Sequence, residues 1–181
     1  MTYKDYKNLK LNDGERAELI NGFAYAMSSP GTEHQLIVST LNAEFYNFLK
    51  GKTCKALPSP YDVRLFYKED NSDDAVVQPD LVVVCDPGKL GKEGCRGAPD
   101  LVIEILSPSN TAMEMNMKKN LYLKARVPEY WIIDPEVKQI EINRLENGEY
   151  IPHILRMGDI LRSFKFEDFS LSLDDLFAQI S

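Results

Sequence analysis

Apolar positions follow two different periods along this chain, and the difference predicts which segments are helices and which are strands. Residues 32–52, TEHQLIVSTLNAEFYNFLKGK, place apolar side chains at helical spacing, and Gly51 supplies a stop signal. Residues 111–125, TAMEMNMKKNLYLKA, have the same period; the SPSN run before them offers Ser and Asn caps, and Pro128 follows. Residues 172–180, SLDDLFAQI, predict a short capped helix near the end of the chain.

The remaining patterned segments alternate or run apolar over short lengths, which is typical of strands. A hairpin is predicted around Asn21-Gly22, where GERAELI passes into GFAYAM. Further strands are predicted in SPYDVRLFY (59–67), VVQPDLVVVCDP (76–87), GAPDLVIEILSP (97–108), EYWIIDP (129–135), KQIEINRL (138–145), NGEYIPHIL (147–155) and SFKFEDFSLSL (163–173). Strands mixed with helices predict an α/β fold, a mixed central β-sheet flanked by helices, in one domain over residues 1–181.

Charge and hydropathy narrow the function classes. The net charge of −7 argues against indiscriminate binding of nucleic acid, which depends on Lys and Arg, although residues 88–126 alone carry +3. No stretch approaches the roughly 20 apolar residues of a membrane span. The first residues, MTYKDYKNLKLNDGE, are polar and do not resemble a signal peptide. We therefore expect a cytoplasmic protein that does not enter a membrane.

The cysteines indicate neither a zinc site nor a disulfide framework. Cys54, Cys85 and Cys95 form no CxxC pair, and the chain has only two histidines. We expect reduced thiols that pack as small apolar groups. A metal ion would then have to bind through oxygen ligands, which suits magnesium or manganese.

Glu104 raises the central question of this sequence, because it lies within the apolar run LVIEIL. A buried carboxylate is costly unless something pairs with it. If this segment and the preceding PDLVVV form an antiparallel pair in which facing residue numbers sum to 184, Asp80 lies opposite Glu104. Facing residues point to one side of a sheet, about 5 Å apart. Two carboxylates at that distance favour a divalent cation between them.

The helix that follows adds a basic group. Glu114, Lys118 and Tyr122 are spaced i, i+4, i+8 and share one face, beside an apolar stripe of Met117, Leu121 and Ala125. The Lys118 face can lean over the end of the sheet, where a lysine would offset the acids. The alternatives are a surface role for Lys118 and a structural ion pair of Glu104 with Lys118 or Arg64.

These motifs resemble the Uma-type family of putative restriction endonucleases, which is similar to the PD-(D/E)XK nuclease superfamily. The resemblance rests on PDLVVV, APDLVIEILSPS, the spacing from Lys118 to Tyr122, and VPEYWIIDP, and it runs from Glu18 to Phe177. It implies a metal-dependent endonuclease that hydrolyses DNA phosphodiester bonds with Mg²⁺ or Mn²⁺. Homodimerisation would follow if both strands of a duplex are cut.

The resemblance also assigns residues. It makes Asp80 and Glu104 metal ligands together with the Ile105 carbonyl, and Lys118 the catalytic lysine, displaced from position 106 onto the following helix. Lys119 is the alternative lysine, and Glu18 and His34 are possible accessory residues. The chain departs from the family at Asn21, Glu114 and Arg126, where Asp, Asp and Gly are common. An inactive nuclease fold that binds nucleic acid or a protein, and a phosphoesterase for small substrates, therefore remain alternatives.

Overall fold

A six-stranded mixed sheet forms the centre of the computed structural model, which describes residues 1–180. Its strand order is β12-β11-β10-β9-β6-β3. β9 and β10 are parallel, and the other neighbours are antiparallel. The strands are β3 (Lys55–Pro58), β6 (Leu81–Val84), β9 (Leu101–Ile105), β10 (Glu129–Asp134), β11 (Gln139–Glu146) and β12 (Glu149–Leu155). The predicted mixed sheet is confirmed, and we call it the central sheet.

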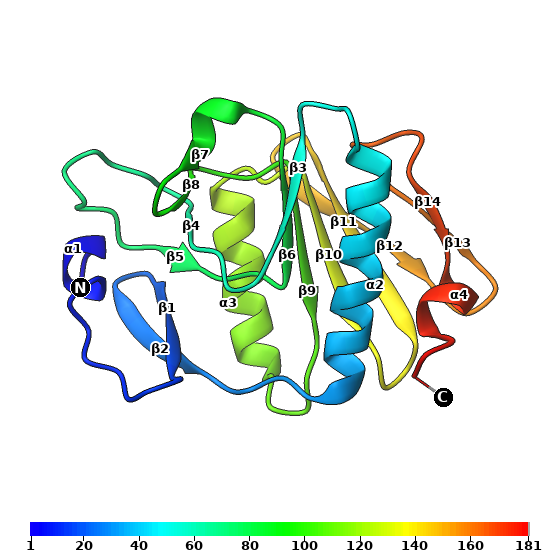
Figure 1. The fold of residues 1–181 in the computed structure, drawn as a ribbon, viewed down its shortest axis with the longest axis horizontal. Helices are drawn as coiled ribbons and strands as arrows, with labels where there is room; N and C mark the ends of the chain where they lie inside the picture. The colour runs from blue at the N-terminus through cyan, green and yellow to red at the C-terminus, as the bar shows by residue number, and fades with distance from the viewer. Residues whose placement is uncertain (181) are drawn as a thin grey trace.

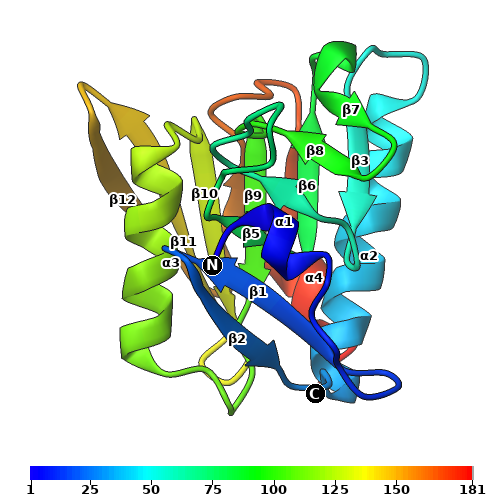
Figure 2. The same ribbon diagram turned by 90° about the vertical axis from the view of Figure 1, so that its left-hand side faces the viewer.

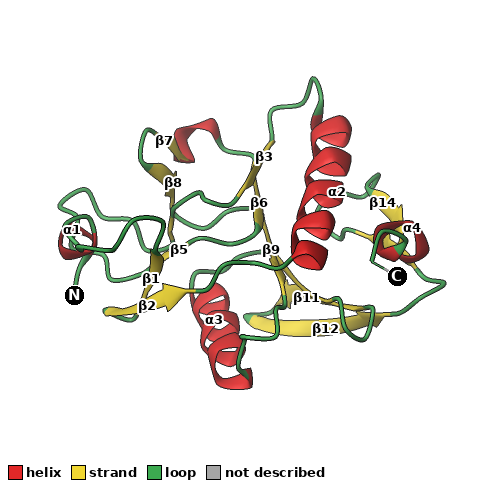
Figure 3. Cartoon of the chain, turned by 60° about the horizontal axis from the view of Figure 1, so that its bottom comes forward, coloured by secondary structure: helices red, strands yellow, loops and turns green. Residues whose placement is uncertain are grey.

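Two long helices cover opposite faces of the central sheet (Figure 1, Figure 3). On one face α2 (Thr32–Leu49) packs with β9 residues such as Ile103, and on the other α3 (Ala112–Lys124) packs with β9 residues such as Val102. Successive strand residues point to opposite faces, so a strand buried on both sides reads as a continuous apolar run. Within residues 1–180, none of the helices is long and apolar enough to cross a membrane.

A second six-stranded sheet, which we call the N-terminal sheet, lies on the α3 side (Figure 2). Its order is β2-β1-β5-β4-β8-β7. The strands are β1 (Arg16–Ile20), β2 (Phe23–Met27), β4 (Val63–Arg64), β5 (Val76–Val77), β7 (Leu90–Gly91) and β8 (Gly94–Arg96), with helix α1 (Tyr3–Tyr6) and the 3-10 turn η1 (Pro87–Lys89) beside them. The hairpin predicted at Asn21-Gly22 is confirmed, and both residues have positive φ, as its tight turn requires.

Two predicted strands are shorter than their patterns. The segment 59–67 is a strand only at Val63–Arg64. The run 76–87 divides into β5 in the N-terminal sheet and β6 in the central sheet, with Gln78, Pro79 and Asp80 between them. Pro79 has no N–H to give to a ladder, so the strand breaks there.

The C-terminal segment adds a small pair of strands, β13 (Ile160–Arg162) and β14 (Ser170–Ser172), and helix α4 (Leu173–Phe177). The strand expected over residues 163–173 is confirmed only in β14. The Glu129 carboxylate accepts hydrogen bonds from the Ser163 hydroxyl and the Lys165 backbone N–H, and these bonds hold that part of the segment as a loop. The Phe169 ring then stacks on Phe45 of α2 at 4.1 Å.

The capping of α3 differs in detail from the sequence expectation. The cap is Thr111, whose hydroxyl accepts a hydrogen bond from the Glu114 N–H at 3.1 Å. Asn110 instead accepts from the N–H and hydroxyl of Ser107. At the other end the chain turns at Arg126, which has φ of 60°. This left-handed conformation is one that glycine adopts most easily, and it accounts for the glycine common in the family here.

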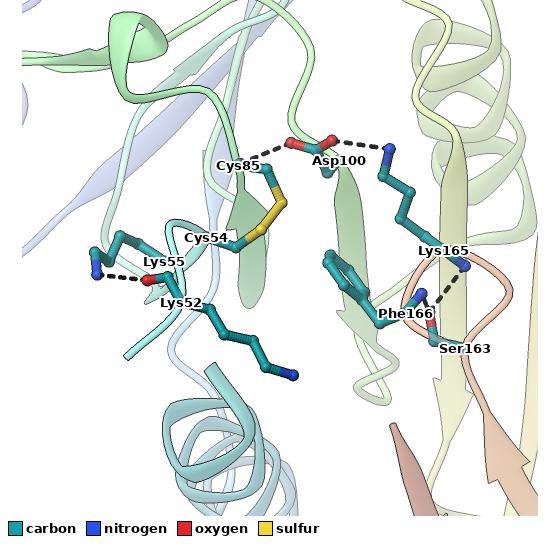
Figure 4. Close-up of a disulfide and its surroundings, with 8 residues drawn as sticks. All are labelled: Lys52, Cys54, Lys55, Cys85, Asp100, Ser163, Lys165 and Phe166. Atoms are coloured by element: carbon teal, nitrogen blue, oxygen red, sulfur yellow. Dashed lines mark hydrogen bonds and ion pairs between the residues drawn. A yellow bond between two sulfur atoms is a disulfide. The ribbon is translucent and has the colours of Figure 1, made fainter. Parts of the chain in front are cut away.

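The expectation of three reduced cysteines is wrong for two of them. Cys54 and Cys85 form a disulfide (Figure 4). Cys95 is free and buried. The antiparallel pairing of β3 with β6 places Lys55 opposite Val84, which brings the next residues, Cys54 and Cys85, together. Their separation of 31 residues gave no sequence signal, because the pairing of β3 with β6 was not predicted.

Candidate active site

The pairing of β6 with β9 has the register that places Asp80 opposite Glu104. Leu81 faces Ile103 and Val82 faces Val102, which confirms the predicted sum of 184. Just beyond the end of this ladder, the Ile105 backbone N–H donates to Asp80 Oδ2 at 2.8 Å. Asp80, Glu104 and Ile105 all line one cavity of about 270 Å³.

Lys118 reaches this cavity from α3 and is itself buried. Its Nζ lies 3.0 Å from Glu104 Oε1 and 2.9 Å from Glu18 Oε2. One turn further along α3, the Tyr122 hydroxyl donates to the same Glu104 Oε1 at 2.6 Å. The predicted Glu114, Lys118 and Tyr122 face therefore points at the sheet, and a surface role for Lys118 is wrong.

Glu18 enters the cavity from the other sheet. It lies in β1, is buried, and accepts a hydrogen bond from the Gln78 N–H at 2.8 Å through Oε1. β1 is held beside this segment because Leu19 pairs with Val76 of β5. The two oxygens of Glu18 thus tie the N-terminal sheet to α3 through Lys118.

His34 lies in the first turn of α2 and also lines the cavity. Its Nε2 is 3.1 Å from Asp80 Oδ2. Burial by itself lowers the pKa of His34, but the hydrogen bond and charge of Asp80 outweigh this effect and raise the pKa. His34 and the Ile105 N–H thus both hold Oδ2 of Asp80.

Lys119 lies outside this arrangement. Its Nζ pairs with Glu141 Oε1 of β11 at 2.6 Å, and it does not line the cavity. Consecutive helical residues are about 100° apart around the axis, so only one of the two lysines can face the acids. The structure places Lys118 beside the acids of the cavity, and Lys119 beside Glu141.

The balance of charge around Lys118 is negative. Burial raises the pKa of Glu104 to about 7, and repulsion from Glu18 and Asp80 adds to the increase, against the opposing effects of Lys118 and Tyr122. Despite its burial, the pKa of Lys118 is raised as well, because Glu104 and Glu18 both stabilise the charged form. Lys118 and His34 thus face three carboxylates, which leaves the acids in excess of the basic groups by one.

This donor set suits a hard divalent cation. Among residues 1–180, no group of three or more His, Cys, Asp and Glu side chains is gathered as a metal cluster. Magnesium does not need one, because it is usually bound through one or two carboxylates and keeps several waters. Asp80 and Glu104 offer carboxylate oxygens of that kind at the wall of one cavity, which Ile105 also lines.

Two partnerships in this region were not predicted. Arg64, an expected alternative partner of Glu104, instead forms a buried ion pair with Asp73. That expectation was wrong because β4 belongs to the N-terminal sheet, where Arg64 turns toward the loop that carries Asp73. The role of the Tyr122 hydroxyl was also missed, although its spacing of four residues from Lys118 was the available signal.

Comparison with known proteins places this geometry in a family. The crystal structure of a putative nuclease belonging to DUF820 from Anabaena variabilis matches with a TM-score of 0.79 over 98% of both chains, at 20% identity. The uncharacterised protein slr1290 of Synechocystis sp. is 25% identical over 150 residues, which cover 82% of this chain and 76% of that protein. The family model Uma2, described as putative restriction endonuclease, matches residues 3–174. The chain therefore belongs to the Uma2 family of putative restriction endonucleases.

Proposed function

We propose that this protein is a metal-dependent endonuclease that hydrolyses the phosphodiester bonds of DNA. The observation that carries the proposal is that the strand register brings Asp80 and Glu104 to the wall of one cavity, with Lys118 buried against Glu104. Membership of a nuclease family and the similar fold of a nuclease support it.

Asp80, Glu104 and the Ile105 carbonyl would hold a Mg²⁺ or Mn²⁺ ion. When bound, such an ion lowers the pKa of a coordinated water and polarises the phosphate. The contacts of each carboxylate with the described part of the protein use only one of its two oxygens. Lys118 and Tyr122 both donate to Oε1 of Glu104, and His34 and the Ile105 N–H both contact Oδ2 of Asp80. The second oxygen of each carboxylate is then the atom that would face the cation.

Lys118 acts in this proposal as the group that stabilises negative charge on the phosphate. A preorganised donor in a site with little water is effective because it needs no rearrangement when charge develops. Glu18 Oε2 lies 2.9 Å from the Nζ of Lys118 and so holds the ammonium group in place. Glu18 is therefore a positioning residue.

The test is cleavage of plasmid and single-stranded DNA with Mg²⁺ or Mn²⁺ by wild type, Glu104→Gln and Asp80→Asn. We expect each substitution to reduce the rate at least about 100-fold, since it removes a charged ligand while keeping the shape of the side chain. Equal cleavage by wild type and Glu104→Gln would discard the assignment.

A second candidate is a nuclease fold that no longer cuts and instead binds nucleic acid or a protein. The observation that favours it is the contact of Lys118 with two carboxylates, which also describes a structural network. Calorimetric titration with Mn²⁺ separates the two candidates. A Kd far above millimolar, with and without DNA, would favour the inactive fold.

We further propose that residues 1–181 act as one domain in the cytoplasm, where DNA is available, and that two copies associate. Cutting both strands of a duplex requires two such sites, which is the reason for expecting a homodimer. Light scattering on the purified protein, alone and with a short duplex, tests the association directly.

A further inference from the structure

A second and larger cavity of about 780 Å³ adjoins the candidate active site. It lies between the first turns of α2 and α3, at the carboxyl ends of the parallel strands β9 and β10. Such edges are where open α/β sheets bind ligands. Four residues line both cavities, namely His34, Ser107, Asn110 and Met115. A molecule in the second cavity would therefore touch the same side chains as a group bound beside Asp80.

The residues that line this cavity disfavour the binding of phosphate. The apolar residues that line it are Leu106, Pro108, Ala112, Met115, Ile132 and Pro135. Within the described part of the chain, no Lys or Arg lines it, whereas Glu33, Asp134 and Glu136 do. The cavity thus suits an uncharged group with apolar faces and amino groups at its edge, and its volume falls in the range of about 300–1,000 Å³ found for small-molecule sites.

Polar side chains that can still donate or accept hydrogen bonds line this cavity, where they could contact the polar edge of a bound group. Asn110 accepts from Ser107 through Oδ1, which leaves its amide N–H groups as donors. Asn116 on α3 and Glu33 on α2 line the cavity and are exposed. Together these three side chains offer both donors and acceptors, which is what the edge of a nucleobase requires.

We propose that this cavity receives one unpaired nucleobase of the DNA strand whose phosphate lies beside Asp80 and Glu104. This inference rests on the proposed nuclease function. Enzymes that handle an extruded base hold it between apolar side chains and contact its edge through hydrogen bonds. Here Met115 and Ile132 would contact the faces of the base, and Met115 suits this role because its sulfur makes favourable contacts with aromatic rings.

The preferred substrate is then a single strand or a locally unpaired site in a duplex. A base held in a stacked, paired duplex cannot enter a cavity next to its own backbone without leaving the stack, and that step costs free energy. The cavity would in this way set which strand type is bound, while the carboxylate pair sets the chemistry.

The experiment compares the binding of two fluorescein-labelled dodecamers, one of deoxycytidine nucleotides, whose bases carry an amino group, and one of the same backbone without bases. Anisotropy is measured without divalent ions, so no cutting is needed. We expect wild type to bind the deoxycytidine strand about tenfold more tightly, the effect of holding roughly one base. Asn116→Phe, which fills the cavity, should abolish this preference. Asn120→Phe, one turn later on the exposed side of α3, should keep it.

Thermal unfolding of both variants establishes that they are folded. Equal affinity of wild type for the two strands, or a preference unchanged in Asn116→Phe, would overturn the inference. Because binding is measured separately from cleavage, a base preference without any cleavage would count against the nuclease function and still support the cavity. Cleavage without a base preference would support the nuclease function and count against the cavity as a site for a base.

Discussion

Two buried ion pairs in this protein differ in how their charge is balanced. Arg64 and Asp73 are matched one to one: Nε and the terminal nitrogen of Arg64 donate to the two oxygens of Asp73, and the guanidinium lies 3.8 Å from the ring centre of Tyr3. Lys118 instead contacts Glu104 and Glu18, with Asp80 nearby, and its surroundings open onto a cavity.

The difference indicates which pair is structural and which belongs to a site. A matched, enclosed pair needs nothing further, so removing one partner should cost only stability. A surplus of carboxylates beside a cavity is unfavourable in the protein alone and is relieved when a cation binds. Uncompensated charge, rather than the presence of buried charge, is therefore the useful signal for function.

The largest expected effect comes from breaking the matched pair. Arg64→Met should lower the free energy of unfolding by about 3–5 kcal/mol, because Asp73 would be left buried without a partner. Urea denaturation measures this loss. Arg144→Met, which breaks the exposed pair with Glu146, is the control and should change stability by less than about 1 kcal/mol. Similar losses in both variants would contradict the structural role of Arg64.

Removing the lysine of the unmatched group should instead affect catalysis. Lys118→Gln is expected to reduce cleavage by about 10²–10³-fold, as for the loss of one donor that stabilises developing charge. Its neighbour offers a matched control: Lys119→Gln removes the same charge but acts outside the cavity, on the contact with Glu141, and should cleave normally. If the two variants lose activity equally, Lys118 has no special role.

The pH dependence of stability should separate the two pairs further. Folding raises the pKa of Glu104 from 4.5 to about 7, so folding takes up a proton between these values and wild type loses stability as pH rises through them. Glu104→Gln cannot titrate, and its stability relative to wild type should increase by about 2 kcal/mol from pH 5 to pH 8. Unfolding curves at both pH values measure the change. A difference independent of pH would contradict the raised pKa.

The smallest expected effect is that of replacing Arg126, which belongs to neither ion pair. A stabilising replacement there would also offset losses of stability in the variants above. Arg126 has a positive φ, so Arg126→Gly should raise the free energy of unfolding by about 0.5–1 kcal/mol. Thermal unfolding should show a higher Tm with cleavage unchanged. A lower Tm would mean that the Arg126 side chain contributes more than its backbone conformation costs.

Much of the candidate site was predictable because its parts are local in sequence. The antiparallel pairing of β6 with β9 was inferred from two similar strands, and the register assumed for it is the one that the structure has. The Lys118 face of α3 followed from helical spacing. Other features depend on contacts between distant segments. The partner of Arg64, the disulfide and the second cavity all require knowing which strands and helices lie side by side, and spacing along one segment does not contain that information.

The change of sheet at Pro79 has a consequence for how the site is assembled. The chain leaves β5 and enters β6 within three residues, and Asp80 is the first residue after the proline. The neighbouring Gln78 is anchored by its N–H to Glu18 and by its side chain to Asp62. The Asp80 carboxylate is itself held within the central-sheet half, by the Ile105 N–H and by His34, so the link to the N-terminal sheet passes through Gln78 and Glu18. Glu18 can therefore reach Lys118 only after the N-terminal sheet has docked on α3, and a misplaced sheet would remove one of the two carboxylates that hold the ammonium.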